Sequence, residues 1–277
     1  MKSFCVNQKT SLKDFTDCTY PQGSFVFRAL LKNGDIRVNG VKVRENVTVC
    51  AGDEVVYYTT AAQEGAASHT VVYEDENVLV ADKLSGVTSE GLFSELNDLF
   101  PLHRLDRNTS GLIAFAKTED AERELLEAFR LRRVEKTYLC LAKNAFVKRE
   151  DTLCAYLKKD EKSALVRIYA RNNGGCEKII TQYRVLEDMG DIAEVEVKLH
   201  TGKTHQIRAH LAFIGCPVLG DEKYGDRTLN AKYSAKRQVL IAKYLRFNCG
   251  GRLAYLNDLP FESALFPKLP KDRQGKE

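Results

Sequence analysis

The residues of this chain best suited to chemistry lie between positions 102 and 114. Asp106 stands between two arginines, Arg104 and Arg107, and is followed by a turn at 109–111 and an apolar run at 112–116. Nearby positive charge favours the ionised form of a carboxyl group, and guanidinium groups suit phosphate. An ionised carboxylate beside such groups can act as a nucleophile on something attached to a polyanion.

A second stretch, at positions 201–211, combines a glycine with several polar residues. The segment 202–204 reads Gly-Lys-Thr and suggests a phosphate-binding loop, but Val197 stands where that loop needs another glycine. The apolar residues at 207, 211 and 214 predict instead a helix from about Thr204 that ends at Gly215. His205 and Arg208 share another side of this helix, and the arginine can present two donors to a carboxylate.

The spacing of the histidines argues against a metal site. They stand at positions 200, 205 and 210. This spacing would place successive histidines well apart around a helix and on opposite faces of a strand. Neither HExxH nor CxxC accompanies them, so we expect no metal. A hydrolase triad of Ser110, His103 and Asp106 lacks the GxSxG turn. Sequence order alone does not exclude it, because triads form in space.

These motifs together resemble a known family. The segments 103–106 (HRLD) and 109–112 (TSGL) resemble the HRLDxxTSGL signature of the RluA-type pseudouridine synthases, and His103 favours this type over the related RsuA type, which usually has glycine there. Three further segments resemble family motifs: 136–138 resembles KxY, 201–208 resembles TGRTHQIR and 217–225 resembles PxxGDxxYG. They occur in the order in which the family has these motifs.

The resemblance implies a role for several residues. Asp106 is expected to be the catalytic aspartate, Arg208 its partner, and Tyr138 the ring that packs against the target base. Four further residues are expected to bind substrate: Arg104, Leu240, Arg107 and His205. We expect no metal, nucleotide or redox cofactor. Two positions depart from the family pattern, Leu84 in place of a proline and Ile241 in place of a histidine. Neither position is one of the expected catalytic residues, so we expect these differences to affect which RNA is recognised and not catalysis itself.

The first sixty residues predict a small separate unit. Ser24 is expected to cap a helix over 25–32 with Gly34 beyond its end. A hairpin of 36–38 and 41–43 across Asn39-Gly40 and a strand at 54–58 are expected to follow. Its LxxGxIxVNG and GDxV patterns resemble the S-four-like RNA-binding module. The residues expected to face RNA are Arg37, Lys42 and Arg44. The alternative is a structural cap with surface lysines.

Composition and strand patterns set the remaining expectations. The chain has 277 residues, a net charge of +4, 44% hydrophobic residues and eight cysteines without a CxxC pair, which is typical of a globular cytoplasmic protein. No signal peptide or membrane span is predicted, and a monomer is expected. Strand-like runs dominate from Val71 onward, and Thr118 caps a helix whose apolar residues 125, 126 and 129 follow helical spacing.

We therefore expect an α+β protein. It comprises an RNA-binding module (1–60), a linker (61–69), a catalytic domain with a mixed, largely antiparallel sheet and a central cleft (70–267), and a polar tail (268–277). The expected activity is conversion of uridine to pseudouridine in RNA, first in large-subunit ribosomal RNA and second in transfer RNA. The alternatives are a non-catalytic RNA-binding or ribosome-assembly protein and a hydrolase of RNA or nucleosides.

Overall fold

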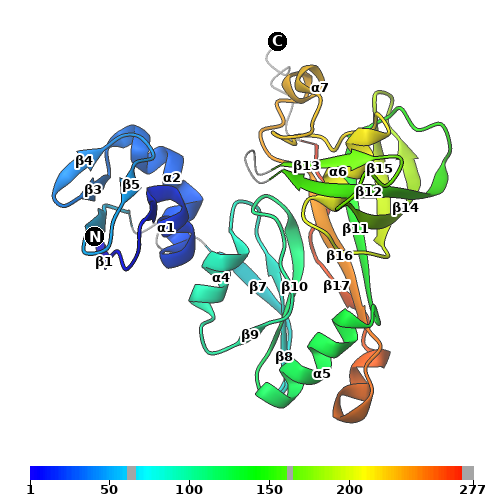
Figure 1. Cartoon of the computed structure of the whole chain (residues 1–277), viewed down its shortest axis with the longest axis horizontal. Coiled ribbons are helices and arrows are strands. Elements are labelled where there is room, and N and C mark those ends of the chain that lie inside the picture. Colours follow the sequence, from blue (N-terminus) through cyan, green and yellow to red (C-terminus); the bar gives the residue numbers. More distant parts are fainter. Residues whose placement is uncertain (61–66, 161–164, 270–277) are drawn as a thin grey trace.

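The computed structural model describes residues 1–60, 67–160 and 165–269, and in these ranges it consists of a small body and a large one (Figure 1). Residues 61–66 of the expected linker (61–69) and residues 270–277 of the expected tail (268–277) lie outside the described residues. No helix within the described ranges is long and apolar enough to cross a membrane.

The small body contains a four-stranded antiparallel sheet, a two-stranded sheet and two helices. The four-stranded sheet has the order β1 (Lys2–Cys5), β6 (Glu54–Tyr57), β3 (Ile36–Val38) and β4 (Val41–Val43). The other elements are β2 (Thr10–Ser11), β5 (Thr48–Val49), α1 (Leu12–Thr19) and α2 (Pro21–Asn33). The body has its own apolar core, which includes Leu30, Ile36 and Tyr57.

The sequence predicted the hairpin and one end of the helix, but not the helix start. The hairpin pairs 36–38 with 41–43 across Asn39-Gly40, where both residues have positive φ. Gly34 ends α2 in the left-handed conformation, as predicted. The prediction that Ser24 caps this helix is wrong, because α2 begins at Pro21, and proline suits the first turn of a helix. Helix α1 was not predicted.

The large body is built on one extended sheet. Its strand order is β13-β12-β14-β15-β11-β16-β10-β8-β7, with β9 beside β10 and β17 beside β16. The strands are β7 (His69–Glu74), β8 (Val78–Lys83), β9 (Phe100–Pro101), β10 (Ser110–Ala116), β11 (Val134–Lys143), β12 (Glu150–Asp160), β13 (Leu165–Tyr169), β14 (Glu177–Asp188), β15 (Ile192–Leu199), β16 (Leu240–Phe247) and β17 (Phe261–Glu262). Among these strands only β10 and β16 pair in parallel, which confirms the predicted mixed, largely antiparallel sheet.

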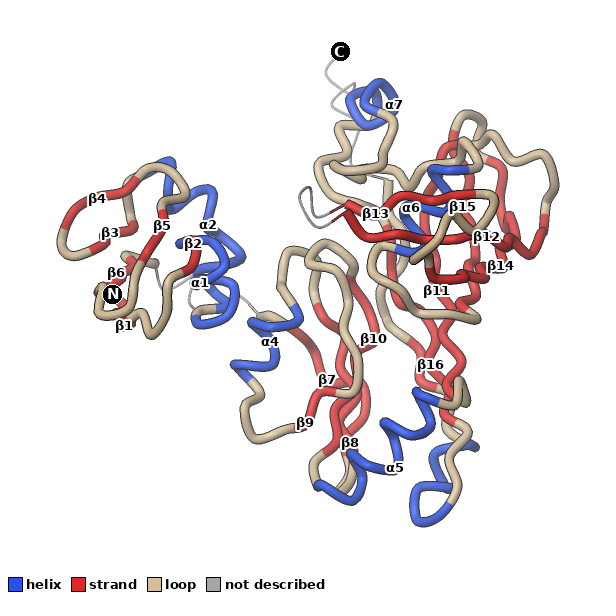
Figure 2. The backbone as a smooth tube through the Cα atoms, viewed as in Figure 1, coloured by secondary structure: helices blue, strands red, loops and turns tan. Residues whose placement is uncertain are grey.

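Helices lie along the edges and faces of this sheet (Figure 2). They are α4 (Ser89–Glu95), α5 (Glu119–Arg130), α6 (Gln206–Phe213), α7 (Arg227–Lys232) and the 3-10 helix η1 (Gly251–Asp258). Thr118 caps α5 by accepting from the Ala121 amide, as predicted. Leu125 of α5 is buried, whereas Leu126 is 40% exposed.

The parallel pair brings the catalytic motif against β16. Gly111 lies opposite Ala242 with a φ of 101°, and a Cβ atom at Gly111 would stand 2.3 Å from the Ala242 carbonyl oxygen. Only glycine permits both this conformation and this approach. The glycine of the TSGL motif therefore sets the distance between the loop before β10 and the strand that carries Leu240.

The two bodies meet next to the catalytic motif. Helices α1 and α2 contact α4, and the Thr88 hydroxyl donates to the carbonyl of Asp17 at 2.9 Å. The guanidinium of Arg107 donates to the Ser24 carbonyl of α2 at 2.8 Å. The position after Asp106 is thus bonded directly to the small body.

Candidate active site

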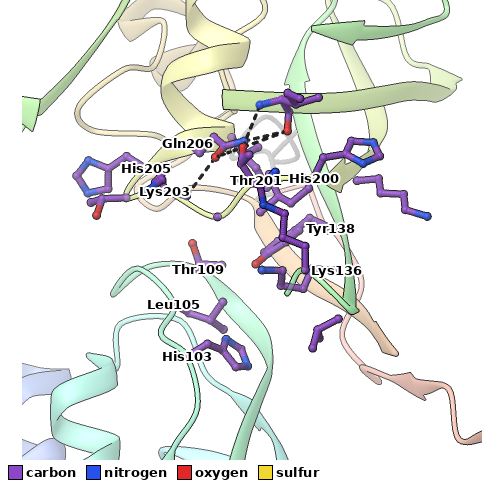
Figure 3. Close-up of a pocket in the computed structure, with 18 of the residues that line it drawn as sticks. His103, Leu105, Thr109, Lys136, Tyr138, His200, Thr201, Lys203, His205 and Gln206 are labelled. Atoms are coloured by element: carbon purple, nitrogen blue, oxygen red, sulfur yellow. Dashed lines mark hydrogen bonds between the residues drawn. The ribbon is translucent and has the colours of Figure 1, made fainter. Parts of the chain in front are cut away.

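A pocket of about 1200 Å³ opens between the 103–109 loop and the segment 198–208. In Figure 3 Leu105 and Thr109 stand on one wall, Thr201, Lys203 and Gln206 stand on the other, and Tyr138 comes from β11. Seven of the lining residues are Arg or Lys and two are Asp or Glu. A concave wall with this excess of positive charge attracts a polyanion.

Asp106 and Arg208 meet in this pocket, although 102 residues separate them in the sequence. Nη1 of Arg208 donates to Oδ2 of Asp106 at 2.7 Å, as the family resemblance implied. The other edge of the guanidinium binds Asp221 in bidentate fashion, with Nε to Oδ2 at 2.7 Å and Nη2 to Oδ1 at 2.9 Å. Arg208 is therefore fixed between two carboxylates, and only that of Asp106 retains exposure.

The charges of this triad hold the arginine in its ionised form. Burial alone would lower the pKa of Arg208, but the bonds and charges of Asp221 and Asp106 raise it above the ordinary value. Burial would likewise raise the pKa of Asp221, yet Arg208 and two backbone amides hold it below its usual range. A fixed guanidinium can orient the Asp106 carboxylate without rearranging during a reaction.

Buried side chains of neighbouring elements form hydrogen bonds that hold the backbone around Asp106 in place. Nζ of Lys83, fully buried at the end of β8, donates to the carbonyl oxygens of Leu84, Val87 and Arg107. The Ser89 hydroxyl both donates to the Leu105 carbonyl and accepts from the Leu105 amide. Burial lowers the pKa of Lys83 to about 7.

Tyr138 and Leu240 line the floor of the pocket. Tyr138 is 8% and Leu240 4% exposed, and both belong to the apolar core that also contains Leu105. Burial and the charge of Asp106 raise the pKa of Tyr138, so this ring remains a neutral phenol. A flat apolar floor beside a carboxylate suits a planar base that has left its stack.

The other three residues predicted to bind substrate lie in different places relative to the pocket. Arg104 is exposed at the rim and pairs with Glu90 at 2.8 Å. His205 lines the pocket, with Nε2 at 4.0 Å from Oδ1 of Asp106. Arg107 is placed differently from the expected substrate contact, because its guanidinium donates to the Gly86 and Ser24 carbonyls, outside the residues that line the pocket.

The predicted basic residues of the small body lie on its hairpin. Arg37 and Lys42 are opposite each other in the register of β3 and β4, and Arg44 follows β4. Lys42 and Arg44 are exposed. Arg37 is partly buried and lies over the ring of Tyr58, 5.1 Å from its centroid.

Three residues that support the site were not assigned a role from the sequence. Asp221 holds Arg208, Lys83 holds the Asp106 loop, and Gln206 accepts from the Thr201 hydroxyl and the Lys203 amide. The PxxGDxxYG pattern was interpreted as a structural turn, and its aspartate was the available indication of a partner for Arg208. The positions that depart from the family pattern are apolar: Leu84 packs on the core and Ile241 is buried.

The histidines are spread as their spacing predicted. His200 is exposed beside Gln182, His210 is buried against Thr181, and His205 faces Asp106. Within residues 1–60, 67–160 and 165–269, no three His, Cys, Asp or Glu side chains form a group that could hold a metal ion.

A carboxylate held by arginine, a buried aromatic floor and basic walls together define an enzyme that acts on a base in a nucleic acid. Comparison with known proteins specifies the class. Residues 71–213 match the model of the RNA pseudouridylate synthase family. The chain therefore belongs to this family of isomerases, which convert uridine in RNA to pseudouridine.

Relatives and solved structures agree with this membership. The chain is 30% identical to the ribosomal large subunit pseudouridine synthase C of Vibrio cholerae, over 91% of this chain and 89% of that protein. It is 31% identical to the Escherichia coli protein of the same name, with the same coverage. Among solved structures, human RNA pseudouridylate synthase domain containing 1 superposes with a TM-score of 0.58 at 26% identity, over 74% of this chain and 93% of that one.

Proposed function

We propose that this protein converts specific uridines of large-subunit ribosomal RNA to pseudouridine, with Asp106 as the catalytic carboxylate. The substrate is inferred from the names of the Vibrio cholerae and Escherichia coli relatives, most of whose length the chain covers. An enzyme of ribosomal RNA acts where that RNA is, so the proposal includes a cytoplasmic location.

The observation that carries the mechanism is the bond from Arg208 to Asp106. It holds one carboxylate oxygen and leaves the other facing the pocket. In the proposed reaction the bond from the ribose to the ring nitrogen breaks and a bond from the ribose to a ring carbon forms. The ring carbon loses a proton and the ring nitrogen gains one, so the product is an isomer and nothing is released overall. Asp106 acts on the nucleoside, Tyr138 and Leu240 hold the base, and the exposed Arg104 fills the space that the base leaves.

The small body and the pocket walls provide RNA binding in this proposal. Lys42 and Arg44 are exposed on the hairpin and can bind phosphate groups without losing another ionic partner among the described residues. Arg107 serves as a tether, because its guanidinium joins the Asp106 loop to α2. The proposed units are 1–60 for RNA binding and 70–267 for catalysis, joined by 61–69 and followed by a polar tail at 268–277.

The test is pseudouridine mapping on unmodified transcripts of large-subunit ribosomal RNA and of transfer RNA, incubated with the protein in the presence of a chelator. The proposal predicts pseudouridine at a few discrete uridines of the ribosomal RNA. Modification of transfer RNA alone would contradict the substrate assignment. Release of free uracil or of RNA fragments would indicate a hydrolase, and RNA binding without product would favour the non-catalytic alternative.

A further inference from the structure

A chain of hydrogen bonds leads from the edge of β13 to the pocket. The Val166 amide donates to Oη of Tyr224 at 2.8 Å, and Oη of Tyr224 lies 2.9 Å from Nδ1 of His205. The other ring nitrogen of His205, Nε2, lies 4.0 Å from Oδ1 of Asp106. Tyr224 therefore contacts the side of His205 that faces away from the proposed catalytic carboxylate.

The proton of the Tyr224 hydroxyl decides which nitrogen of His205 is the donor. A phenol has one proton, and here its oxygen already accepts from a backbone amide. Donation of that proton to His205 makes Nδ1 the acceptor and leaves the ring proton on Nε2. The opposite tautomer would turn the lone pair of Nε2 toward the negative oxygen of Asp106, which is unfavourable. Both arguments select the Nε2–H tautomer.

The surroundings of His205 leave the ring uncharged. Burial lowers the pKa of His205 to about 4. The positive charges of Arg208 and Lys223 also lower this pKa, whereas the negative charges of Asp106 and Asp221 oppose the shift. At neutral pH the ring therefore carries a single N–H proton, and it can donate a hydrogen bond toward the pocket only when that proton is on Nε2. A hydrogen bond that fixes the tautomer is then a functional requirement rather than a detail of packing.

The backbone fixes the positions of both residues. His205 has a φ of 54° at the start of α6, a conformation that histidine tolerates better than most residues. Oδ1 of Asp221, which accepts from Arg208, also accepts from the amides of Lys223 and Tyr224. One carboxylate thus fixes the arginine that holds Asp106 and the tyrosine that contacts His205.

We propose that Tyr224 is a positioning residue that fixes His205 as the Nε2–H tautomer, and that His205 donates a hydrogen bond to an oxygen of the target nucleotide beside Asp106. The second half rests on the proposed function, since it requires a uridine nucleotide in this pocket. The first half concerns the protein alone.

The first experiment measures the tautomer directly. Long-range proton–nitrogen NMR correlations are recorded on protein with ¹⁵N-labelled histidine, and the His205 signals are identified by their loss in His205→Gln. We expect a protonated Nε2 and an unprotonated Nδ1 in the unaltered protein. In Tyr224→Phe, where only the charge of Asp106 still favours Nε2–H, we expect a measurable population of the Nδ1–H tautomer. A protonated Nδ1 in the unaltered protein, or an unchanged pattern in Tyr224→Phe, would overturn the proposal.

The second experiment measures rate and affinity on RNA. Tyr224→Phe should lower the single-turnover rate about five- to tenfold, the worth of one neutral hydrogen bond, with little change in RNA affinity. Tyr183→Phe is the matched control, because this buried hydroxyl donates to the Lys148 carbonyl away from the pocket, and its rate should not change. An equal loss in both variants, or none in Tyr224→Phe, would contradict the assignment.

A third comparison covers the case in which Tyr224→Phe does not fold. His205→Gln keeps an N–H donor near the position of Nε2, whereas His205→Phe keeps the ring shape and loses the donor. The proposal predicts that the glutamine variant retains at least about fivefold more activity than the phenylalanine variant. Equal activities would overturn it. If the unaltered protein makes no pseudouridine, the proposed function fails, while the NMR result still decides the tautomer.

Discussion

The pocket around Asp106 and the hairpin of the small body are both rich in charge, but their side chains are held in different ways. In the pocket, Arg208 makes three hydrogen bonds to two carboxylates, and behind the Asp106 loop the buried Lys83 makes three to backbone carbonyls. On the hairpin, Lys42 and Arg44 are exposed, and no ion pair of theirs exists among the described residues. The difference is between a site whose geometry is fixed and one that supplies charge alone.

This difference follows from what each task requires. Acting on one bond requires a carboxylate at a defined position before the substrate arrives, which only a side chain with several partners can provide. Binding the phosphates of a flexible polyanion requires positive charge that can adapt to its position. Substitutions in the two regions should therefore alter different quantities, the rate in one and the affinity in the other.

The largest effect is expected from Arg208→Lys. Lysine keeps the charge but cannot bind Asp221 in bidentate fashion and reach Asp106 as well, so the single-turnover rate should fall about 10²- to 10³-fold with RNA affinity nearly unchanged. Arg184→Lys on β14, whose pairing with Glu196 is exposed, is the control and should retain its rate. A loss of affinity in place of rate would assign Arg208 to RNA binding.

Lys83→Met should affect stability next most strongly. It leaves the carbonyls of Leu84, Val87 and Arg107 without their donor, at a cost of about 2–3 kcal/mol in the free energy of unfolding. Lys143→Met removes a solvent-accessible ion pair with Asp226 and should change the free energy of unfolding far less. Urea denaturation distinguishes the two. Equal costs would mean that the Asp106 loop does not depend on Lys83.

The sequence anticipated the meeting of Asp106, Arg208 and Tyr138 but not what holds them. The resemblance to the family motifs predicted that Arg208 meets Asp106, although the two residues are 102 positions apart in the sequence. The partner of Arg208 was missed because a GD pair in a turn gives no local sign that its carboxylate reaches a helix 13 residues earlier. The role of Arg107 depends on how the small body docks against α4, and no periodicity within either body encodes that contact.

On the hairpin, the double variant Lys42→Ala/Arg44→Ala should weaken RNA binding about tenfold and lower the slope of log affinity against log salt by roughly 1–2. The rate at saturating RNA should not change. A matched loss of two charges, Arg123→Ala/Arg252→Ala, removes side chains that pair with Asp120 near α5. Equal weakening by both variants would mean that net charge, and not the hairpin, governs affinity.

The smallest effect, taken for a single histidine, concerns stability against pH. Burial lowers the pKa of His103 to about 3 and the pKa values of His205 and His210 to about 4, against about 6.5 in the unfolded chain. Between these values the unfolded chain binds more protons, so the free energy of unfolding falls as pH decreases from about 6.5 toward 4, by about 1 kcal/mol per histidine in the first unit. Urea midpoints for the unaltered protein and His210→Gln test this, since the variant should show a shallower fall. A pH-independent midpoint would contradict the buried, neutral state of these rings.

The most direct test of the account is pseudouridine formation by Asp106→Asn, measured beside RNA binding under identical conditions. Asparagine keeps the size of the side chain and loses its negative charge. The account predicts intact RNA binding and no detectable pseudouridine in any RNA that the unaltered protein modifies. Turnover by the variant would remove Asp106 from the centre of the mechanism, and the fixed geometry around it would need another explanation.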